Sequence, residues 1–313
     1  MKIKISVIVS LYNEEKVVDS FWKSLQKELI ALPETVFEVI WVNDGSIDKT
    51  QEKINILQNQ CKTQNIKHIS IEFSKNFGHE AAMIAGIDNS CGDAIICLDA
   101  DEQHPPSEIG NMIATFQEGN DIVLMERKNR EDSSFLKKSL SSLFYKLINL
   151  LSTVKFQNNS TDFFLTSKQV AEILKTNYRE QNRFVRGFIQ SVGFQKAVLP
   201  FNAPARTFGE SNYSYLSLIK LAFNALFSFS NKPLRLSMIF SVLFILFTFI
   251  FSLYSLYMYI YGNTPPSGYT TLVLFLSFSF SLLFLTITVL SLYFEKAIQE
   301  MKKRPIYIVK NKK

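Results

Sequence analysis

The sequence predicts an α/β protein: a mainly parallel sheet with helices on both faces, followed by a hairpin of two transmembrane helices. Two observations lead to this prediction. From residue 3 to residue 127, short apolar runs alternate with stretches of helical length, which is typical of βαβ units. Near the other end of the chain, residues 236–294 contain no Asp, Glu, Lys, Arg or His and are rich in Phe, Leu and Ile.

Five strands are expected in the first part of the chain. They are residues 3–11, 37–42, 67–73, 94–98 and 121–125. Helices between them are expected from about residue 48 to 63 and from 80 to 90. Tyr12-Asn13-Glu14-Glu15 opens the first helix, and Pro105-Pro106 marks the start of the fourth, because proline is favoured in a first helical turn. The run 94–98 is wholly apolar, as in a strand buried on both faces of a parallel sheet.

Polar residues follow each expected strand. They are Asn13, Glu14, Asp44, Ser46, Lys75, Asp99, Asp101 and Arg127. Ligands of parallel α/β sheets bind beyond the carboxyl ends of the strands, so these acids and bases are expected to share one edge of the sheet. No Gly-x-Gly-x-x-Gly follows the first strand, which argues against a dinucleotide cofactor.

Asp99 and Asp101 are candidates for a metal site. Strand side chains two residues apart point the same way, so both carboxylates can lie on one side of the strand end. Hard oxygen donors open to solvent suit Mg²⁺ or Mn²⁺ ions that also take phosphate oxygens as ligands. Acidic residues can also simply end a strand and cap the next helix, and the pair alone leaves both interpretations open.

The apolar region breaks once, at residues 262–268, into stretches of about 237–261 and 269–293. About 20 apolar residues suffice to span a bilayer, and neither stretch has a polar face, which disfavours a buried soluble hairpin. Basic residues flank both ends: Lys232, Arg235, Lys296, Lys302, Lys303 and Arg304. The positive-inside rule therefore places both flanks in the cytoplasm and the turn outside. A membrane surface also explains the net charge of +6 better than nucleic acid does.

The start of the chain and its cysteines indicate a cytosolic domain. A strand follows Met1-Lys2 at once, so no cleavable signal is expected. Cys61, Cys91 and Cys97 are odd in number and lack ligand spacing, so reduced structural thiols are expected.

Two further helices are expected beside the membrane. Residues 134–151 carry leucines at helical spacing with lysines between them, so this helix either lies at the lipid surface or packs on its own domain. Residues 215–229 form an interfacial lead-in to the first span. The expected organisation is a cytosolic domain, a juxtamembrane helix, two transmembrane helices and a basic tail: residues 1–212, 213–233, 234–294 and 295–313.

Several stretches, in this order, resemble polyprenyl-phosphate glycosyltransferases of family 2, which have the Rossmann-like GT-A fold and include bactoprenol glucosyltransferases and dolichol-phosphate mannose synthases. The resemblance runs from about residue 4 to 307. The matching stretches are 6–15 (SVIVSLYNEE), 43–46, 73–82 (FSKNFGHEAA), 92–106, 183–187, 209–213, 228–236 and 302–305.

The resemblance implies a metal-dependent, inverting transfer of one sugar, from a nucleotide sugar such as a UDP-hexose to undecaprenyl or another polyprenyl phosphate. The setting would be the cytoplasmic face of a bacterial inner membrane, in O-antigen or other cell-envelope synthesis. The cofactor would be Mg²⁺ or Mn²⁺. The resemblance leaves room for a homo-oligomer, a downstream flippase and a second glycosyltransferase as partners.

The same resemblance implies roles for individual residues. Asp162 and Asp101 would be catalytic, and Asp99 and Asp101 would hold the metal. Asp162 would orient the acceptor or take a residual proton, unless it is only a loop acid. The nucleotide sugar would contact Tyr12, Glu14, Asp44, Lys75, Gln103, Arg127 and Arg130. The acceptor phosphate would contact Arg183, Arg186 and Arg206.

The chain departs from the family pattern at Ser10, His79, Glu102, His104, Phe164 and Asn212. These departures bear on the identity of the donor sugar and on the residues around the metal more than on the reaction class. A histidine beside the metal, His104, would make Mn²⁺ better tolerated than Mg²⁺. Two other functions stay open. One is a transferase that extends a saccharide chain, for which Gln181–Phe184 faintly resembles the usual Gln-x-x-Arg-Trp motif. The other is a non-catalytic membrane subunit that binds nucleotide sugar.

Overall fold

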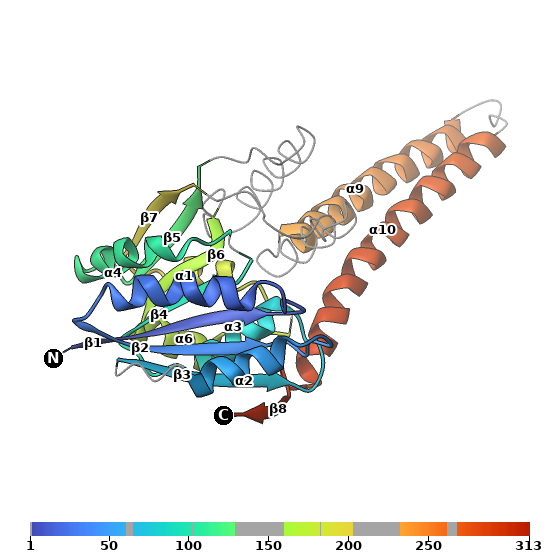
Figure 1. Ribbon diagram of the computed structural model, residues 1–313. Coiled ribbons are helices and arrows are strands. Elements are labelled where there is room, and N and C mark those ends of the chain that lie inside the picture. The colour runs from blue at the N-terminus through green and yellow to red at the C-terminus, as the bar shows by residue number, and fades with distance from the viewer. Residues whose placement is uncertain are drawn as a thin grey trace. The chain divides into compact units, whose positions relative to one another are not determined.

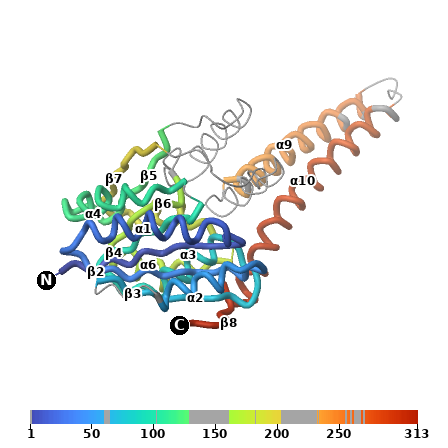
Figure 2. The backbone as a smooth tube through the Cα atoms, in the orientation of Figure 1, coloured from blue at the N-terminus to red at the C-terminus, as the bar shows by residue number. Residues whose placement is uncertain are grey.

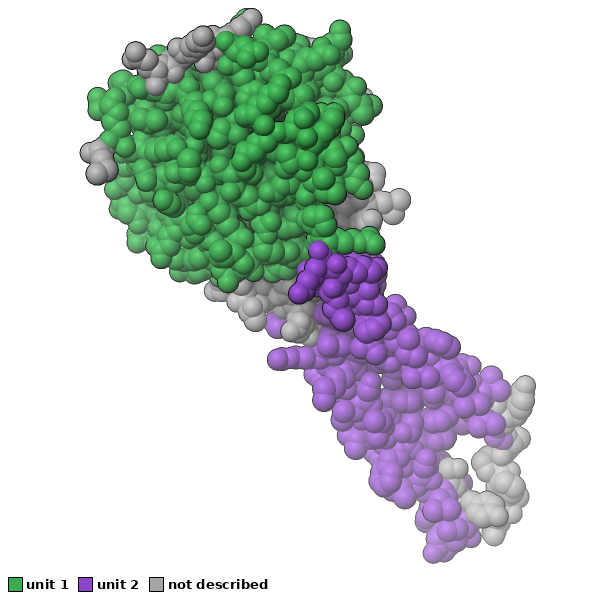
Figure 3. Space-filling model, turned by 90° about the horizontal axis from the view of Figure 1, so that it is seen from below, with its two compact units in different colours: residues 1–146, 154–216, 304–313 green, residues 147–153, 217–303 purple. Residues whose placement is uncertain are grey.

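The computed structural model describes residues 2–60, 65–101, 103–128, 160–181, 183–202, 232–261 and 268–313. The chain divides into two compact units, coloured separately in Figure 3. Of the described residues, the first unit holds 2–202 and 304–313, and the second holds 232–303.

The first unit is built on an eight-stranded sheet with the order β7-β5-β6-β4-β1-β2-β3-β8 (Figure 1). The strands are β1 (Ile3–Leu11), β2 (Thr35–Asn43), β3 (Ile66–Phe73), β4 (Ala94–Asp99), β5 (Ile122–Arg127), β6 (Ser160–Ser167), β7 (Lys196–Phe201) and β8 (Val309–Lys312). Four neighbouring pairs are parallel, and β4–β6, β5–β6 and β3–β8 are antiparallel. The predicted fold class is confirmed, and the five predicted strands correspond to β1 to β5.

Helices cover both faces of the sheet (Figure 1). The helices α1 (Val18–Ile30), α2 (Thr50–Gln60) and α4 (Ile109–Gln117), with the short 3₁₀ helix η1 (Pro106–Glu108), lie on one face. The other face is covered by α3 (His79–Asp88), α6 (Lys168–Asn177) and α7 (Val185–Ser191). Because both faces are covered, residues 94–98 of β4 are all buried, as predicted for a central parallel strand.

Helix α3 packs unusually close to the sheet. Its residues 81–87 are all buried, and a Cβ atom at Gly86 would lie 2.2 Å from Cγ2 of Ile8 in β1. Only glycine permits this approach without a shift of β1. The start of α3 is thereby held close to the carboxyl end of the central strands, where the predicted site lies.

The last residues of the chain return to the sheet of the first unit (Figure 2). β8 pairs with the edge strand β3, Ile306 is buried, and the ring of Tyr307 stacks on Phe73 with centroids 5.1 Å apart. The sequence predicts only a basic tail here, because the strand Val-Lys-Asn-Lys is polar and fully exposed. This segment joins the sheet through backbone hydrogen bonds, which a pattern of apolar residues in the sequence does not reveal.

The second unit contains two long helices, α9 (Lys232–Tyr261) and α10 (Tyr269–Met301). Both are apolar enough to cross a membrane, over residues 234–258 and 271–301, and neither window is buried in the structure. They pack against each other through aromatic rings such as Phe251 and Phe275, which stack 5.2 Å apart. Ser and Thr hydroxyls bond to carbonyls of the preceding turn, as lipid requires. The two apolar helices that the sequence predicts are confirmed as candidate membrane spans.

Several predictions fall outside the described residues. They are the helices at 134–151 and 215–229, together with Cys61, Glu102, Arg130, Arg206 and Asn212. Cys91 and Cys97 are both free thiols, as expected.

Candidate active site

The loops after β1 and β2 are locked together and form one side of the site. The backbone N–H of Asn13 donates to Oγ of Ser46 (2.9 Å), and Oδ1 of Asn13 accepts from the N–H of Ile47 (3.0 Å). This exchange holds Asn13 in the left-handed conformation, with φ of 56°. Tyr12 beside it is half-exposed, and Glu14 is fixed through its backbone N–H to Thr50 (2.9 Å). The contact of these two residues with a nucleotide sugar stays a prediction.

Asp44, at the end of β2, holds the turn after β3. It is almost fully buried, and its carboxylate oxygens accept hydrogen bonds from the N–H groups of Phe77 (2.6 Å) and Gly78 (2.9 Å). Burial raises the pKa of Asp44, although these donors oppose the shift. The neighbouring Gly45, at φ of 66°, lies against the backbone of Lys75, where a Cβ would approach to 2.3 Å. Asp44 therefore fixes the turn that carries Lys75, and its contact with the nucleoside stays a prediction.

Three of the family departures surround Asp99. The hydroxyl of Ser10 donates to Oδ1 of Asp99 (2.8 Å), and Nδ1 of His79 lies 3.1 Å from the same hydroxyl. On the other side, Nδ1 of His104 lies 3.6 Å from Oδ2 of Asp99. These residues belong to three different segments of the chain. The three departures from the family pattern therefore lie around the same carboxylate.

His104 serves the backbone of β4. Its Nδ1 accepts a hydrogen bond of 2.9 Å from the N–H of Asp99, and its ring stacks on Phe163 at 5.2 Å. The side chain is buried, and burial lowers the pKa of His104 despite the nearby carboxylates. A neutral imidazole here supports the end of the strand that carries the acidic pair. Its predicted place beside a metal ion stays a prediction.

His79 lies between two carboxylates. Its Nε2 is 3.5 Å from Oδ1 of Asp99 and 3.5 Å from Oδ2 of Asp162. Burial of the ring lowers the pKa of His79, but the two carboxylates outweigh that effect and raise the pKa to about 10. His79 is therefore a cation that links the end of β4 to the start of β6.

Asp162 also pairs with Arg186, whose Nε lies 2.7 Å from Oδ1. Burial acts to raise the pKa of Asp162, but Arg186 and His79 prevail and hold the pKa well below its usual range. The carboxylate is only 14% exposed. Asp162 is thus a fixed anion between two cations, an arrangement suited to orienting groups and poorly suited to removing protons.

Asp101, Gln103 and Arg127 form the remaining part of the β4 edge. Oδ1 of Asp101 accepts from the N–H of Gln103 (3.2 Å), and Oε1 of Gln103 accepts from Nη2 of Arg127 (2.9 Å). Gln103 thereby links the acidic pair to a cation at the end of β5. Its contact with the nucleotide sugar stays a prediction.

The segment before α7 brings its arginines to the same edge. Nη2 of Arg183 donates to the carbonyl of Phe77 (3.5 Å), and the N–H of Val185 donates to Oε2 of Glu80 (2.8 Å). Burial raises the pKa of Glu80, with the charge of Asp162 adding to the rise. Arg183 and Arg186 thus lie beside the turn that Asp44 holds and beside Asp162, and their contact with an acceptor phosphate stays a prediction. Glu80 was not predicted, because nothing in its sequence context distinguishes it from a surface acid at a helix start.

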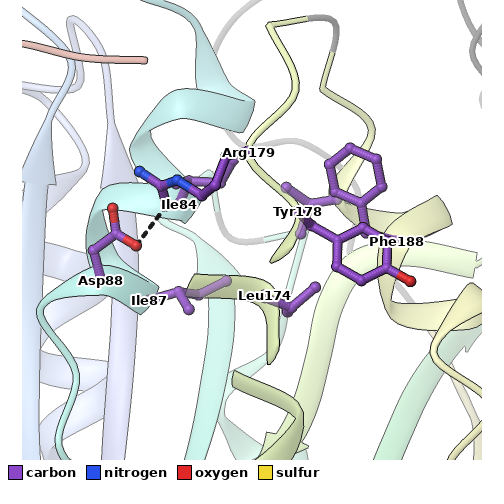
Figure 4. Close-up of a pocket in the computed structure, with 8 residues that line it drawn as sticks. Ile84, Ile87, Asp88, Leu174, Tyr178, Arg179 and Phe188 are labelled. Atoms are coloured by element: carbon purple, nitrogen blue, oxygen red, sulfur yellow. Dashed lines mark hydrogen bonds and ion pairs between the residues drawn. The ribbon is translucent and has the colours of Figure 1, made fainter. Parts of the chain in front are cut away.

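A small cavity lies under this segment, between α3, α6 and α7 (Figure 4). Its volume is about 10 Å³, and it is lined by apolar side chains such as Ile84, Leu174 and Phe188 together with the ion pair of Asp88 and Arg179. One water molecule would fill such a space, so the cavity is not a substrate site.

Comparison with known proteins identifies the family. Residues 6–174 match the sequence model described as Glycosyl transferase family 2. The chain is 34% identical over 310 residues to the bactoprenol glucosyl transferase of Shigella phage SfV, with 99% of each chain covered. It is 32% identical over 307 residues to the uncharacterized glycosyltransferase YkcC of Bacillus subtilis, with 98% of this chain and 93% of that protein covered.

Solved structures with a similar fold include glycosyltransferases of low sequence identity. The glucosyl-3-phosphoglycerate synthase of Mycobacterium tuberculosis, in complex with Mn²⁺, UDP-glucose and phosphoglyceric acid, has a TM-score of 0.46 and 14% identity. The alignment covers 72% of this chain and 78% of that one. S. aureus TarS 1-349 has a TM-score of 0.44 and 19% identity, with 64% and 59% covered. The match to the family model and the extent of the sequence relatives show that the chain belongs to glycosyl transferase family 2 and is a glycosyltransferase, as the resemblance implied.

Proposed function

We propose that the protein transfers a single hexose from a nucleotide sugar, most simply a UDP-hexose, to a polyprenyl phosphate with inversion. The observation that carries this proposal is the arrangement around Asp162. Its Oδ2 lies 3.5 Å from Nε2 of His79, which also lies 3.5 Å from Asp99 at the end of β4, and its Oδ1 contacts Arg186. His79 thus links Asp162 to a carboxylate suited to a metal-bound diphosphate, and Arg186 is suited to an anionic acceptor. The relatives named bactoprenol glucosyl transferase and the two apolar helices support a lipid-linked acceptor.

On the donor side, Asp99 and Asp101 fit a divalent cation. Their oxygens are hard ligands and both side chains are partly exposed. Among the described residues, no three His, Cys, Asp or Glu side chains are grouped to hold an ion by themselves. Donor phosphates and water would complete the coordination, as is usual for Mg²⁺ and Mn²⁺. Bound there, the ion would neutralise charge on the leaving diphosphate.

On the acceptor side, the nucleophile itself explains why Asp162 need not act as a base. A phosphate monoester has a second pKa near 6, so polyprenyl phosphate is largely dianionic at pH 7. It needs cations to guide it rather than a strong base. Arg183 and Arg186 are placed to do this, and Asp162 holds Arg186 in position. The low pKa of Asp162 agrees with an orienting role.

The pairing of β8 with β3 supports a hairpin topology. Residues 2–202 precede α9 and residues 304–313 follow α10, yet both belong to the same compact unit. If both helices span the membrane, the chain must leave and return on one side. The basic flanks place that side in the cytoplasm. A product made there must cross the membrane before use outside, so a flippase and a second transferase stay predicted partners.

A radiolabel assay tests the function directly. Membranes with the full chain would be incubated with labelled nucleotide sugars, polyprenyl phosphate and Mg²⁺ or Mn²⁺. We expect label in a lipid that organic solvent extracts and mild acid cleaves, and no label with Asp101→Asn. Label in polymer would instead favour a chain-extending transferase, and label in neither fraction would favour a non-catalytic subunit.

A further inference from the structure

Asp88, the last residue of α3, binds two side chains from distant parts of the chain. Its Oδ1 lies 2.7 Å from Nη1 of Arg179 (Figure 4), and its Oδ2 accepts a hydrogen bond of 2.8 Å from the hydroxyl of Tyr307. Arg179 begins the stretch that leads to Arg183 and Arg186. We call residues 178–181 and 183–186 the acceptor segment, and residues 304–313 the tail. One carboxylate thus joins the tail to the acceptor segment.

Tyr307 is firmly held within the tail. Its ring stacks on Phe73 at 5.1 Å and an interplanar angle of 12°, and Ile306 beside it is buried. The N–H of Ser74 donates to the carbonyl of Ile308 (3.0 Å), and β8 continues this pairing. Burial and the charge of Asp88 raise the pKa of Tyr307, so its hydroxyl keeps its proton and remains a donor.

Two further contacts join the same parts. The side-chain amide of Gln181 donates to the carbonyl of Arg304. Phe73, under the ring of Tyr307, packs edge-on against Phe77 at 5.8 Å, and the carbonyl of Phe77 accepts from Arg183. The tail therefore reaches the acceptor segment by three routes, through Asp88, Gln181 and Phe73.

We propose that the tail positions the acceptor segment, and that Tyr307 is a positioning residue for the binding of polyprenyl phosphate. This inference rests on the proposed function, because it takes Arg183 and Arg186 as the acceptor contacts.

The test compares two substitutions in the tail of the full-length protein in membranes. Tyr307→Phe keeps the ring that stacks on Phe73 and removes the hydroxyl, with its bond to Asp88 and its interaction with Asn89. The matched control, Lys310→Ala, removes an exposed pair with Glu72 (2.6 Å) that has no part in the three routes. For Tyr307→Phe we expect the KM for polyprenyl phosphate to rise about 3- to 10-fold, less than the full effect of a charge-assisted hydrogen bond because Tyr307 acts on the acceptor segment through Asp88, with the KM for the nucleotide sugar unchanged. For Lys310→Ala neither constant should change.

Hydrogen exchange supplies a readout that needs no turnover. Amides of residues 178–191 should exchange faster in Tyr307→Phe than in the wild type or Lys310→Ala. If the wild type transfers no sugar to lipid, the proposed function is overturned. The hydrogen-exchange rates would still test whether Tyr307 positions the acceptor segment. Unchanged exchange in Tyr307→Phe, or an equal rise in the KM for both substrates, would overturn the positioning role itself.

Discussion

Nε of Arg186 lies 2.7 Å from Oδ1 of Asp162, and the other carboxylate oxygen faces His79. The acid that the resemblance marks as catalytic is therefore held between two cations. Under the proposed function Asp162 would hold Arg186 in place for the acceptor, which leads to the first two predictions.

Asp162→Asn should lower kcat by about 100-fold or more, because Arg186 and His79 both lose their anionic partner. The pH profile should keep its shape. The pKa of Asp162 lies well below its usual range, so Asp162 does not titrate between pH 6 and 8, where the rate rises as the acceptor phosphate loses its second proton. Initial rates over this range check the prediction. A deficit that disappears at pH 8 would show that Asp162 removes a proton instead.

His79→Gln should reduce turnover by roughly 10-fold or more, because Asp99 and Asp162 would lose the cation between them. His79→Lys keeps a cationic side chain at this position, and should retain more activity than His79→Gln. Steady-state rates with melting temperatures as a folding control compare the two. Equal activity of the two variants would show that the charge of His79 is dispensable.

Asp101→Asn should cut turnover by about 100-fold or more while leaving the fold intact, because it removes a charged ligand from a partly exposed strand end. Chelation by EDTA should have the same effect on the wild type, and added Mg²⁺ or Mn²⁺ should reverse it. Asp19→Asn, which alters an exposed acid of α1 paired with Lys53, serves as the control and should be neutral. Full activity in EDTA would exclude a metal requirement.

His68 should make the stability of the first unit fall in mild acid. Its Nδ1 accepts a hydrogen bond from Nε1 of Trp41 (3.1 Å), and burial lowers the pKa of His68 to about 4. The neutral form is favoured in the fold, so its contribution is complete above pH 6.5 and is lost as the pH falls towards 4. At pH 5 the loss amounts to at most about 2 kcal/mol. Melting at pH 7.5 and pH 5 should show a larger decrease for the wild type than for His68→Gln, and equal decreases would contradict this.

Gly86→Ala should destabilise the protein by about 1–3 kcal/mol, because the new methyl group meets Ile8 at the face of β1. Gly110→Ala in α4 is the matched control. A Cβ at Gly110 has no neighbour within 4 Å, and alanine is the better helix former, so stability should stay the same or rise slightly. Thermal melting measures both. A neutral Gly86→Ala would mean that β1 shifts without cost.

The sequence by itself predicted the parts that depend on local pattern. Alternating apolar runs predicted β1 to β5, and the charge-free stretch at 236–294 predicted α9 and α10. The carboxyl ends of parallel strands meet at one edge, so Asp44, Asp99 and Asp101 could be placed together before any coordinates were known. These features follow from periodicity and from the rules of parallel sheets.

Only the tertiary structure decided which side chains meet across that edge. Ser10 and His79 lie far apart in sequence, and their common contact with Asp99 depends on β1 lying next to β4, which no local pattern encodes. The sequence also did not predict that the tail pairs with β3. This exposed strand is held by backbone hydrogen bonds rather than by burial of apolar side chains. Such contacts form only when segments that are far apart in the sequence come together in the fold. Here they stabilise the ionised form of Asp162 and bring the hydroxyl of Tyr307 to Asp88.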